Sequence, residues 1–426
     1  MLRSSALRPL RNRDFALVWS AALLSNVGSW MQTVAVGVLV TAITDQARWT
    51  GLVAAAAFLP MGLLSPVGGA LADNVDRRRW LLMTTVGETA FATLLAVLVG
   101  TGHATPLGVT LVVLGGGCMT ALGFPAYQAI LPDLVRRDEL LGAMSLSAAQ
   151  YNLGRVLGPA AAGVVLAAGS YTWAFALNAA SFGAVLVALV FVRIPAASRD
   201  VEGGSLRSRI AGGARAAFRE PGCRLAIVTI GVTAFLLSPF IALIPAVALK
   251  LFDAGDTGTS VLVTAQGVGA VAGALAQAPL AQRFGRPRVL TADLVVLPLV
   301  VTLYALAPNL VLAAAALVAL GAAYIGILSG LSTVVQLRAP AAYRARIFSL
   351  WMVALGVIYP IGSVAQGALG DRLGLRVVTA GCAGAFLALV LATRALRPGL
   401  GEALDDPEDR EQDGRELPPT AAGAVV

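Results

Sequence analysis

Apolar segments of about twenty residues or more recur along most of the chain, separated by short segments that contain charged residues, glycine or proline. An α-helix of about 20 apolar residues crosses the hydrocarbon core of a bilayer and satisfies its backbone hydrogen-bonding groups internally. The pattern therefore predicts an all-α membrane protein with twelve spans. The expected spans lie near residues 15–41, 49–72, 80–100, 107–131, 143–168, 171–192, 223–249, 258–281, 289–308, 310–337, 346–369 and 376–396.

The composition agrees with this fold class and argues against catalysis. Of the 426 residues, 58% are hydrophobic and 13% are charged, which is too little polar cover for a soluble globular domain. Cys118, Cys223 and Cys382 form no CxxC pattern, and the single histidine, His103, falls in a short loop. We therefore expect no metal site, no cofactor and no enzymatic activity. A GxxxxGK[ST] motif is absent, so we expect no direct use of ATP.

The basic residues indicate the topology. With the N-terminus inside, 26 of the 31 lysines and arginines fall in cytoplasmic segments, whereas the outer loops carry only Arg48, Lys250, Arg372 and Arg376. This bias predicts that both termini are cytoplasmic. The 30 arginines and abundant alanine and glycine are typical of a GC-rich bacterial genome, so we expect a bacterial cytoplasmic membrane. The net charge of +8 follows from topology, and we expect no nucleic-acid partner.

The longest interior connection divides six spans from six. Residues 193–222 are rich in glycine, serine and arginine and are expected to form a cytoplasmic linker. Residues 1–192 and 223–397 then form two six-helix bundles. Residues 398–426 contain eight acidic residues and almost no aromatic ones, which predicts a disordered cytoplasmic tail.

The two halves share short sequences, as expected of an internal repeat. The sequence Gly-Ala-Leu-Ala occurs at 69–72 and again at 273–276, and the same offset places Gly158 on Gly362. Many transporters use repeated halves to build two alternative packings around a central site. Some of this identity is also expected by chance in helices rich in alanine and glycine.

A motif between the second and third spans resembles the cytoplasmic loop signature of the major facilitator superfamily, Gly-x-x-x-Asp-(Arg/Lys)-x-Gly-(Arg/Lys)-(Arg/Lys). The matching residues are Gly69, Asp73, Arg77 and Arg78, whereas Asn74 and Asp76 depart from the signature. A carboxylate at this helix end can bind an arginine or a helix N-terminus in one conformation only, which predicts a gating role for Asp73. Alternatively, the arginines only anchor a helix end at lipid headgroups.

The fifth span contains a second motif, similar to one in exporters and antiporters of that superfamily. Its residues are Gly154, Gly158, Pro159 and Gly163. Glycines four residues apart share a helix face and allow another helix to approach closely, and proline favours a bend. Packing alone also explains the glycines, whereas the proline in this register favours an exporter.

The chain to about residue 397 resembles the transmembrane secretion effector branch of this superfamily, which includes siderophore exporters. The segments 10–15, 25–32, 58–66 and 131–135 carry this likeness, together with the two motifs. The resemblance implies two pseudo-symmetric six-helix bundles and a secondary-active, proton-coupled exporter. Its expected substrate is a small hydrophobic or amphipathic molecule such as a drug, siderophore or secondary metabolite. An importer or facilitator of the same fold and a non-transporting membrane sensor are the alternatives.

Two charged residues fall near the middle of expected spans, where charge is costly and usually marks function. Glu88 and Arg155 are expected either to form a buried ion pair or to act separately, Glu88 in proton coupling and Arg155 on an anionic substrate. In the family fold the third helix usually lies outside the cavity, which argues against Glu88. Asp293 is expected to pair with Arg286 or Arg288.

The first and fourth helices of each half line the cavity in the family fold. Their uncharged polar residues are the expected substrate contacts, although each can instead satisfy a backbone carbonyl. They are Asn26, Gln32, Tyr127, Gln128, Tyr324 and Gln336. The expected partners are a small-molecule substrate, a proton counter-ion and the lipid bilayer, and the protein is expected to be a monomer.

Overall fold

The structure is a computed structural model that describes residues 7–192, 215, 217–339, 347, 350–351 and 353–396, with only the backbone of residues 72–74. The expected linker at 193–222 is described only at Arg215 and from residue 217, and the tail at 398–426 lies outside the described residues. All secondary structure in the described part is helical. The expectation of an all-α protein is confirmed.

The first half contains α1 (Arg13–Thr44), α2 (Ala47–Asn74), α3 (Arg77–Gly100), α4 (Pro106–Ile130), α5 (Leu140–Ala167) and α6 (Tyr171–Phe191). Short 3-10 helices precede α1 and join α4 to α5; they are η2 (Arg8–Arg11), η3 (Pro132–Leu134) and η4 (Arg137–Glu139). The second half contains α8 (Pro221–Leu236), α9 (Pro239–Phe252), α10 (Gly255–Phe284), α11 (Arg286–Leu306), α12 (Leu310–Arg338), the π-helical turn η6 (Ala354–Ile358), α14 (Tyr359–Leu373) and α15 (Leu375–Leu396).

Ten segments of the described chain are long and apolar enough to cross a membrane, with α8 and α9 counted together. Helix α5 is not among them, because it carries Arg155 and several uncharged polar residues. Helix α14 is short and ends in a charged turn. All twelve expected spans coincide with helical segments, but the one expected at 346–369 is described continuously only from Val353. Twelve crossings are consistent with these helices and stay a prediction.

Several helices begin at polar side chains that bind the first free backbone amides. Asp76 accepts a hydrogen bond from the amide of Arg79 at 2.8 Å and so begins α3 directly after the charged loop. Asn309 does the same for α12, with 2.9 Å to the amide of Leu312. Such N-caps stabilise a helix end by about 1 kcal/mol. They explain why the spans begin where the apolar runs begin.

The seventh expected span, 223–249, is not one helix. It is divided into α8 and α9 at Ser238 and Pro239. Proline has no amide hydrogen and cannot continue the hydrogen-bond pattern of the preceding helix. The Thr233 carbonyl oxygen ends α8 by accepting from the backbone amides of Leu237 and Ser238 at 2.9 and 2.8 Å, and the Ser238 hydroxyl adds a bond to the same oxygen at 3.1 Å.

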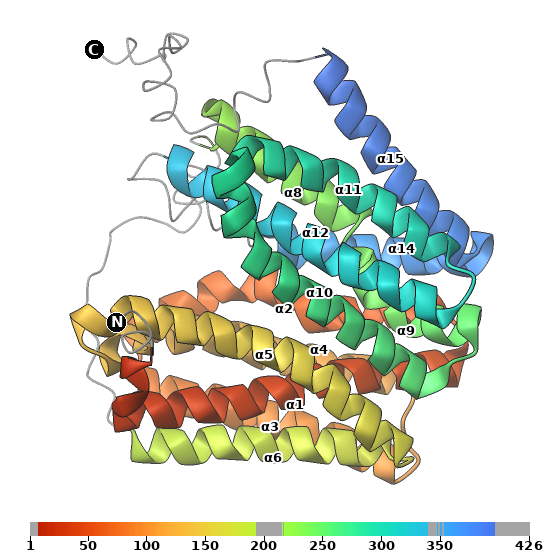
Figure 1. Cartoon of the computed structure of the whole chain (residues 1–426). Helices are drawn as coiled ribbons and strands as arrows, with labels where there is room; N and C mark the ends of the chain where they lie inside the picture. Colours follow the sequence, from red (N-terminus) through yellow and green to blue (C-terminus); the bar gives the residue numbers. More distant parts are fainter. Residues whose placement is uncertain are drawn as a thin grey trace, which may run out of the picture.

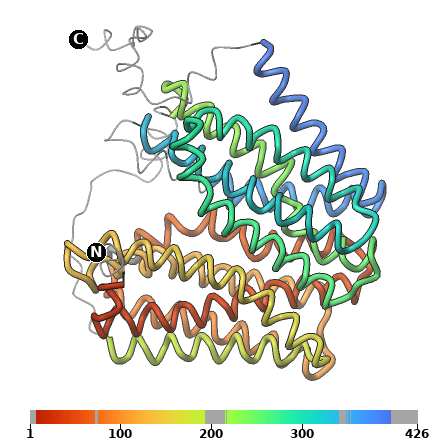
Figure 2. Tube along the Cα trace, viewed as in Figure 1, coloured from red at the N-terminus to blue at the C-terminus, as the bar shows by residue number. Residues whose placement is uncertain are grey.

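The helices form two bundles that lie side by side (Figure 1). In the first half, α1 packs on α5 and α6, whereas α4 packs on α2 and α3. In the second half, α12 packs on α10 and α11, and α15 packs on α11 and α14. The same division into halves is visible in the chain trace (Figure 2).

The halves meet where α2 packs on α14 and η6, α5 on α10, and α1 on α9. Glycine allows the closest of these approaches. A Cβ atom on Gly62 of α2 would lie 2.8 Å from the carbonyl carbon of Gly356 in η6. Small residues let helices approach closely in a membrane, where dispersion and hydrogen bonding replace the hydrophobic effect between helices.

The two ends of the molecule differ in how the halves are joined. We call the end where α6 finishes and α8 begins the linker end, and the end that contains the loop between α1 and α2 the far end. At the far end, the Asp371 carboxylate of α14 accepts hydrogen bonds from the backbone amides of Ala47 and Arg48, at 2.7 and 2.9 Å. These amides begin α2 of the other half, so Asp371 caps a helix across the junction.

Lys250 of α9 strengthens this junction. Its Nζ donates to the carbonyl oxygen of Asp45 at 2.8 Å and lies 3.6 Å from the Asp371 carboxylate. The Tyr171 hydroxyl of α6 donates to the carboxylate of Asp256 in α10 at 2.8 Å. The bonds of Lys250 to Asp45 and of Tyr171 to Asp256 join one half to the other at the far end, whereas the contact of Lys250 with Asp371 lies within the second half.

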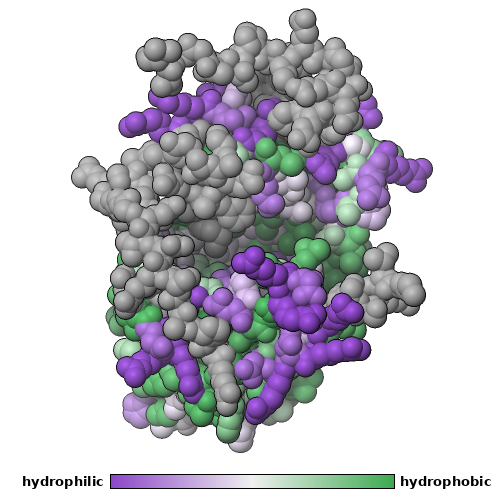
Figure 3. Space-filling view, turned by 90° about the vertical axis from the view of Figure 1, so that its left-hand side faces the viewer, coloured by the Kyte–Doolittle hydropathy of each residue, from purple (hydrophilic) through white to green (hydrophobic). Residues whose placement is uncertain are grey.

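Among the described residues, the two halves are less closely joined at the linker end. Figure 3, which looks onto this end, shows a recess between the two parts of the molecule, with hydrophilic side chains along part of its edge. In Figure 1 the bundles lie close together at the far end and diverge toward the linker end. The described conformation is therefore closed at the far end.

We predict that Asp371→Asn increases the fraction of molecules that are open at the far end. A hydrogen bond to a charged group contributes about 1.5–3 kcal/mol, so loss of the charge should change the open-to-closed ratio by about tenfold or more. Spin labels at His103 and Pro308, on the far-end loops of the two halves, would report the separation by pulsed electron paramagnetic resonance.

Asp253→Asn is the matched control for this measurement. Asp253 is exposed at the same end, its left-handed backbone conformation is one that asparagine tolerates, and it makes no described bond to the first half. Equal distance distributions for Asp371→Asn and the wild type would show that the cap does not hold the far end closed.

Candidate functional site

A cavity of about 830 Å³ lies at the junction and extends into the first half. All six helices of the first half contribute to its wall, and α9, α10, η6 and α14 contribute from the second half. Its size falls within the range of small-molecule sites, which are typically about 300–1,000 Å³. The wall is mostly apolar, so the few polar groups on it determine what it can bind.

Glu88 of α3 lies on this wall and is the only acidic or basic side chain among the described residues that line the cavity. Thr120 of α4 donates a hydrogen bond to Glu88 Oε1 at 2.6 Å. Thr84 and Thr85, one turn earlier on α3, also line the cavity. The cavity thus has one carboxylate, held in place by a neighbouring helix.

Aromatic side chains surround much of the remaining wall. They are Trp30, Phe58, Phe91, Phe124, Tyr127, Tyr151, Phe182 and Tyr359. The ring of Trp30 meets that of Tyr151 edge to face, with centroids 6.2 Å apart, and Phe58 meets Tyr359 at 5.6 Å. The Phe58 and Tyr359 pair joins the two halves at the cavity.

Four of the expected substrate contacts line the cavity, namely Asn26, Gln32, Tyr127 and Gln128. Gln32 is already engaged, because its side-chain oxygen accepts a hydrogen bond from Asn178 Nδ2 of α6 at 2.9 Å. Their role in substrate binding stays a prediction.

The other two expected contacts do not line the cavity in this conformation. Tyr324 is buried within the second half, where its hydroxyl lies 3.0 Å from the Ser238 hydroxyl and its ring packs on Phe240. Gln336 is exposed and does not line the cavity. The cavity extends into the first half rather than symmetrically into both, so it does not reach these α12 side chains.

Glu88 and Arg155 do not form an ion pair, which is one of the two alternatives that the sequence leaves open. The Arg155 guanidinium lies 5.6 Å from the centre of the Trp30 ring, and its Nη2 is 3.5 Å from the side-chain oxygen of Gln266 in α10. Arg155 lies on the part of α5 that packs against α1 and α10, whereas Glu88 projects from α3 toward α4. The usual position of the third helix outside the cavity argues against Glu88 as a coupling site, but here one face of α3 reaches the cavity wall.

Asp293 has a different partner from the expected one. Its carboxylate accepts a hydrogen bond from Gln277 Nε2 of α10 at 3.0 Å, in place of Arg286 or Arg288. Gly326 of α12 lies directly against this pair. Asp293 does not line the large cavity.

The loop motif is described in part. Gly69 faces Pro125 of α4. Asp73 belongs to the last turn of α2, but its side chain lies outside the described residues, so the gating hypothesis stays a prediction. Arg77 forms an ion pair with Asp133 at 2.9 Å. Arg78 donates to the carbonyl oxygens of Leu189 and Val190 at the end of α6, at 2.8 and 2.5 Å.

Arg77 and Arg78 thus bind within the first half, where Arg78 satisfies carbonyl groups that a helix end leaves free. Arg79 is exposed, as headgroup anchoring requires.

The glycines of the second motif lie at helix contacts. A Cβ atom on Gly154 would lie 2.7 Å from Asn26 Cβ, and one on Gly158 would overlap Trp30. Gly163 instead faces Ser260 of α10, and Pro159 is buried. The motif therefore packs α5 between α1 of its own half and α10 of the other half. The contacts of Gly154 and Gly158 set the positions of Asn26 and Trp30, which both line the cavity.

Apart from Glu88, the sequence does not indicate the cavity-lining residues of α3, α5 and α6. Gln150 of α5 is 1% exposed, lines the cavity, and its Nε2 has no hydrogen-bond partner among the described residues. Thr120 was missed although it lies in an expected cavity helix. Ser147, Gln150 and Tyr151 recur at helical spacing, and this periodicity is the signal that indicates a polar face on α5.

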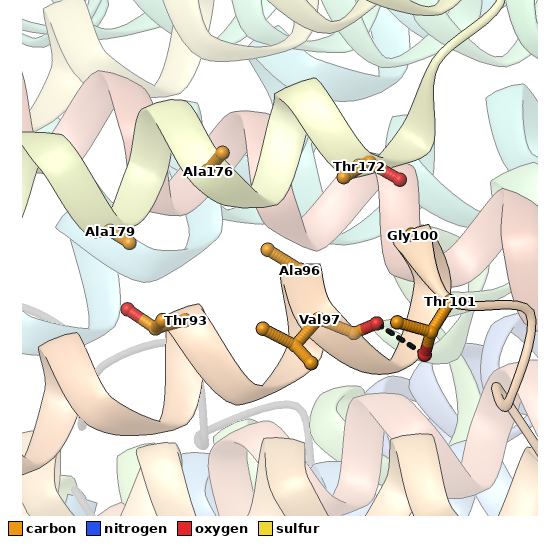
Figure 4. A pocket seen from close by; sticks show the side chains of 8 residues that line it. All are labelled: Thr93, Ala96, Val97, Gly100, Thr101, Thr172, Ala176 and Ala179. Atoms are coloured by element: carbon orange, nitrogen blue, oxygen red, sulfur yellow. Dashed lines mark hydrogen bonds between the residues drawn. The ribbon is translucent and has the colours of Figure 1, made fainter.

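A second, shallower pocket lies between α3 and α6 near the far end (Figure 4). Its wall consists of Thr93, Ala96, Val97, Gly100, Thr101, Thr172, Ala176 and Ala179. No charged side chain lines it, and the Thr101 hydroxyl is already bonded to the carbonyl oxygen of Val97. The large cavity is therefore the candidate site.

Comparisons with known proteins agree with this geometry. The family described as transmembrane secretion effector matches residues 4–416. The chain is 26% identical over 387 residues to the multidrug efflux pump Tap of Mycolicibacterium fortuitum, covering 88% of this chain and 92% of Tap. It is 27% identical over 367 residues to the enterobactin exporter EntS of Salmonella paratyphi A, covering 84% and 86%.

The fold also agrees with a solved structure. A bacterial homologue of the human lysosomal transporter Spinster, in an inward-facing and unoccupied conformation, superposes with a TM-score of 0.69 at 14% identity, over 97% of this chain and 100% of that one. The predicted fold and the prediction of a transporter rather than an enzyme are confirmed. The match over almost the whole chain and the two packed helical bundles show that this multi-pass membrane protein belongs to the transmembrane secretion effector family of the major facilitator superfamily.

Proposed function

We propose that this protein exports small hydrophobic or amphipathic molecules from the bacterial cytoplasm by alternating access, in exchange for protons. The observation that carries the proposal is a largely apolar cavity with a single carboxylate, closed at the far end by bonds between the halves. The names of two relatives, a multidrug efflux pump and an enterobactin exporter, support export and a small-molecule substrate.

The orientation follows from the basic residues. The described loops between α2 and α3, between α4 and α5 and between α10 and α11 lie at the linker end, and the segments that the sequence assigns to the cytoplasm hold 26 of the 31 lysines and arginines. The positive-inside rule therefore favours a cytoplasmic linker end, with both termini inside. In this orientation the described conformation is inward-facing, and its cavity receives substrate from the cytoplasm. We infer that the protein acts as a monomer, because both halves of the cavity come from one chain.

Release requires the far end to open. The bonds of Asp371, Lys250 and Tyr171 must then break, and the linker ends of the two halves must approach each other. Helices α2 and α5 pack directly on the second half, so a rigid rotation of either half moves the cavity wall. Such rocking of one repeat against the other is the usual way in which a transporter exposes a central site to each side in turn.

Glu88 is the group that we assign to proton exchange. A carboxylate within a membrane protein is costly when charged and tends to mark a proton path. Among the described lining residues the other titratable groups are the phenols of Tyr127, Tyr151 and Tyr359, and the bond from Thr120 fixes the Glu88 carboxylate on the wall. Exposure of Glu88 to the two sides in turn couples its protonation to substrate movement.

We predict that inside-out membrane vesicles accumulate a lipophilic dye when their interior is acidified. In such vesicles an exporter moves substrate inward as protons leave, so collapse of the pH gradient with nigericin should abolish accumulation. The measurement is dye fluorescence in vesicles with and without the protein. Accumulation of the dye only in right-side-out vesicles would favour an importer. Equilibration of the dye across the membrane with or without the pH gradient would favour a facilitator.

We predict that Glu88→Gln abolishes accumulation driven by the pH gradient but retains downhill movement of a neutral substrate. The amide keeps the size of the side chain and cannot exchange a proton. Asp293→Asn is the matched control, because this carboxylate binds Gln277 away from the cavity wall, and its gradient dependence should equal that of the wild type. An unaltered gradient dependence in Glu88→Gln would remove Glu88 from the coupling mechanism.

A further inference from the structure

We propose that Glu88 is also the counter-ion of the transported substrate, and that the substrate class is therefore lipophilic monocations, such as amphipathic amines and quaternary ammonium or phosphonium compounds. This inference rests on the proposed function, since it names the substrate class of the same cavity.

The charges on the cavity wall point to a cation. Glu88 is the only ionic side chain among the described lining residues, and no arginine or lysine lines the wall with it. Arg155 contacts the lining residue Trp30 but is not part of the lining, and its guanidinium is engaged by that ring and by Gln266. An anionic ligand in this cavity would meet a carboxylate and no opposite charge on the wall.

One oxygen of Glu88 is available to a ligand. Thr120 donates to Oε1, whereas Oε2 receives no hydrogen bond from the described residues, and the side chain is partly exposed on the cavity wall. A cation that leaves water for an apolar site needs an opposite charge nearby, and an ammonium group also needs acceptors for its hydrogen bonds. Oε2 supplies both for an ammonium group, and supplies the charge for a quaternary cation.

The groups around Glu88 also suit a lipophilic cation. Phe91 lies three residues after Glu88 on α3, and Phe124 lies four residues after Thr120 on α4, and both line the cavity. Residues three and four apart share a helix face, so these rings are on the same face as the carboxylate and its hydroxyl partner. Aromatic rings attract cations through their negative faces and also bury apolar substituents. The remaining wall is apolar enough to receive the rest of the molecule.

The test uses two probes of nearly equal shape and opposite charge, tetraphenylphosphonium and tetraphenylborate. Equilibrium binding of radiolabelled tetraphenylphosphonium is measured with the purified full chain in lipid nanodiscs, with protein-free nanodiscs as the blank. We expect saturable binding to the wild type that tetraphenylborate does not displace. Glu88→Gln should weaken the affinity by about thirtyfold or more, because the cation then lacks its counter-charge.

Two variants separate a loss of charge from a loss of structure. Glu88→Asp retains the carboxylate and should keep most of the affinity, and Asp293→Asn, which removes a carboxylate outside the lining, should bind as the wild type does. Thermal unfolding of each preparation checks that the helical bundle is intact. If Glu88→Gln unfolds at a lower temperature than the wild type, binding of the two probes to the wild type and to Glu88→Asp still decides the charge preference.

Three results would overturn the substrate class: equal affinity of Glu88→Gln and the wild type for tetraphenylphosphonium, equal binding of tetraphenylborate, or no binding of the cation to the wild type. If neutral or anionic compounds are nevertheless accumulated by acidified inside-out vesicles, the proposed export function stands and only the substrate class fails. If no compound is moved in those vesicles, the export function itself fails.

Discussion

The hydrocarbon core of a bilayer offers no hydrogen-bonding partner to the polypeptide, and the rest of this structure depends on that constraint. Every backbone group that crosses the core must be satisfied within the protein, so the described crossing segments are helices. The same constraint makes ionic side chains rare in the apolar segments. Glu88 and Arg155 are therefore prominent, and their placement determines the chemistry available at the centre of the molecule.

Packing between the halves decides where these side chains lie. Helix α5 is held between α1 and α10 by contacts that only small residues allow, and Arg155 is thereby directed to Trp30 and Gln266. Helix α3 packs on α4 and brings Glu88 to Thr120. The cavity consequently has a carboxylate on its wall with no arginine beside it. Both substrate selection and proton exchange, as proposed, follow from this separation of charges.

The junction at the far end has a different physical character from the cavity wall. It is made of charge-assisted hydrogen bonds from Asp371 and Lys250 to backbone groups of the other half. Such bonds are strong when intact and depend on direction, so a small rotation of one half can break them together. Dispersion contacts between glycines and neighbouring helices depend less on direction than these hydrogen bonds do, so they allow the helices to slide past each other more readily. This combination suits a molecule that must be closed at one end yet able to open there.

Part of the candidate site can be predicted from the sequence. Sequence reasoning identified the helices, the two motifs shared with the superfamily and several cavity-lining residues, because all of these can be recognised from short stretches of sequence. Of the two alternatives that it left open for Glu88 and Arg155, the ion pair is not formed, and Tyr324 and Gln336 do not line the cavity in this conformation. It also treated residues 223–249 as one helix, although Ser238 and Pro239 divide it.

Sequence alone is enough to indicate that the chain crosses a membrane in helices and that it belongs to a family of transporters, and it predicts that most basic residues lie on one side of the membrane. These properties depend on segment length, composition and short motifs, which do not change on folding. Which polar side chains share the cavity, and which end is closed, follow from how the helices pack. The reason is that the direction of a side chain depends on the rotation of its helix, and packing against neighbouring helices sets that rotation.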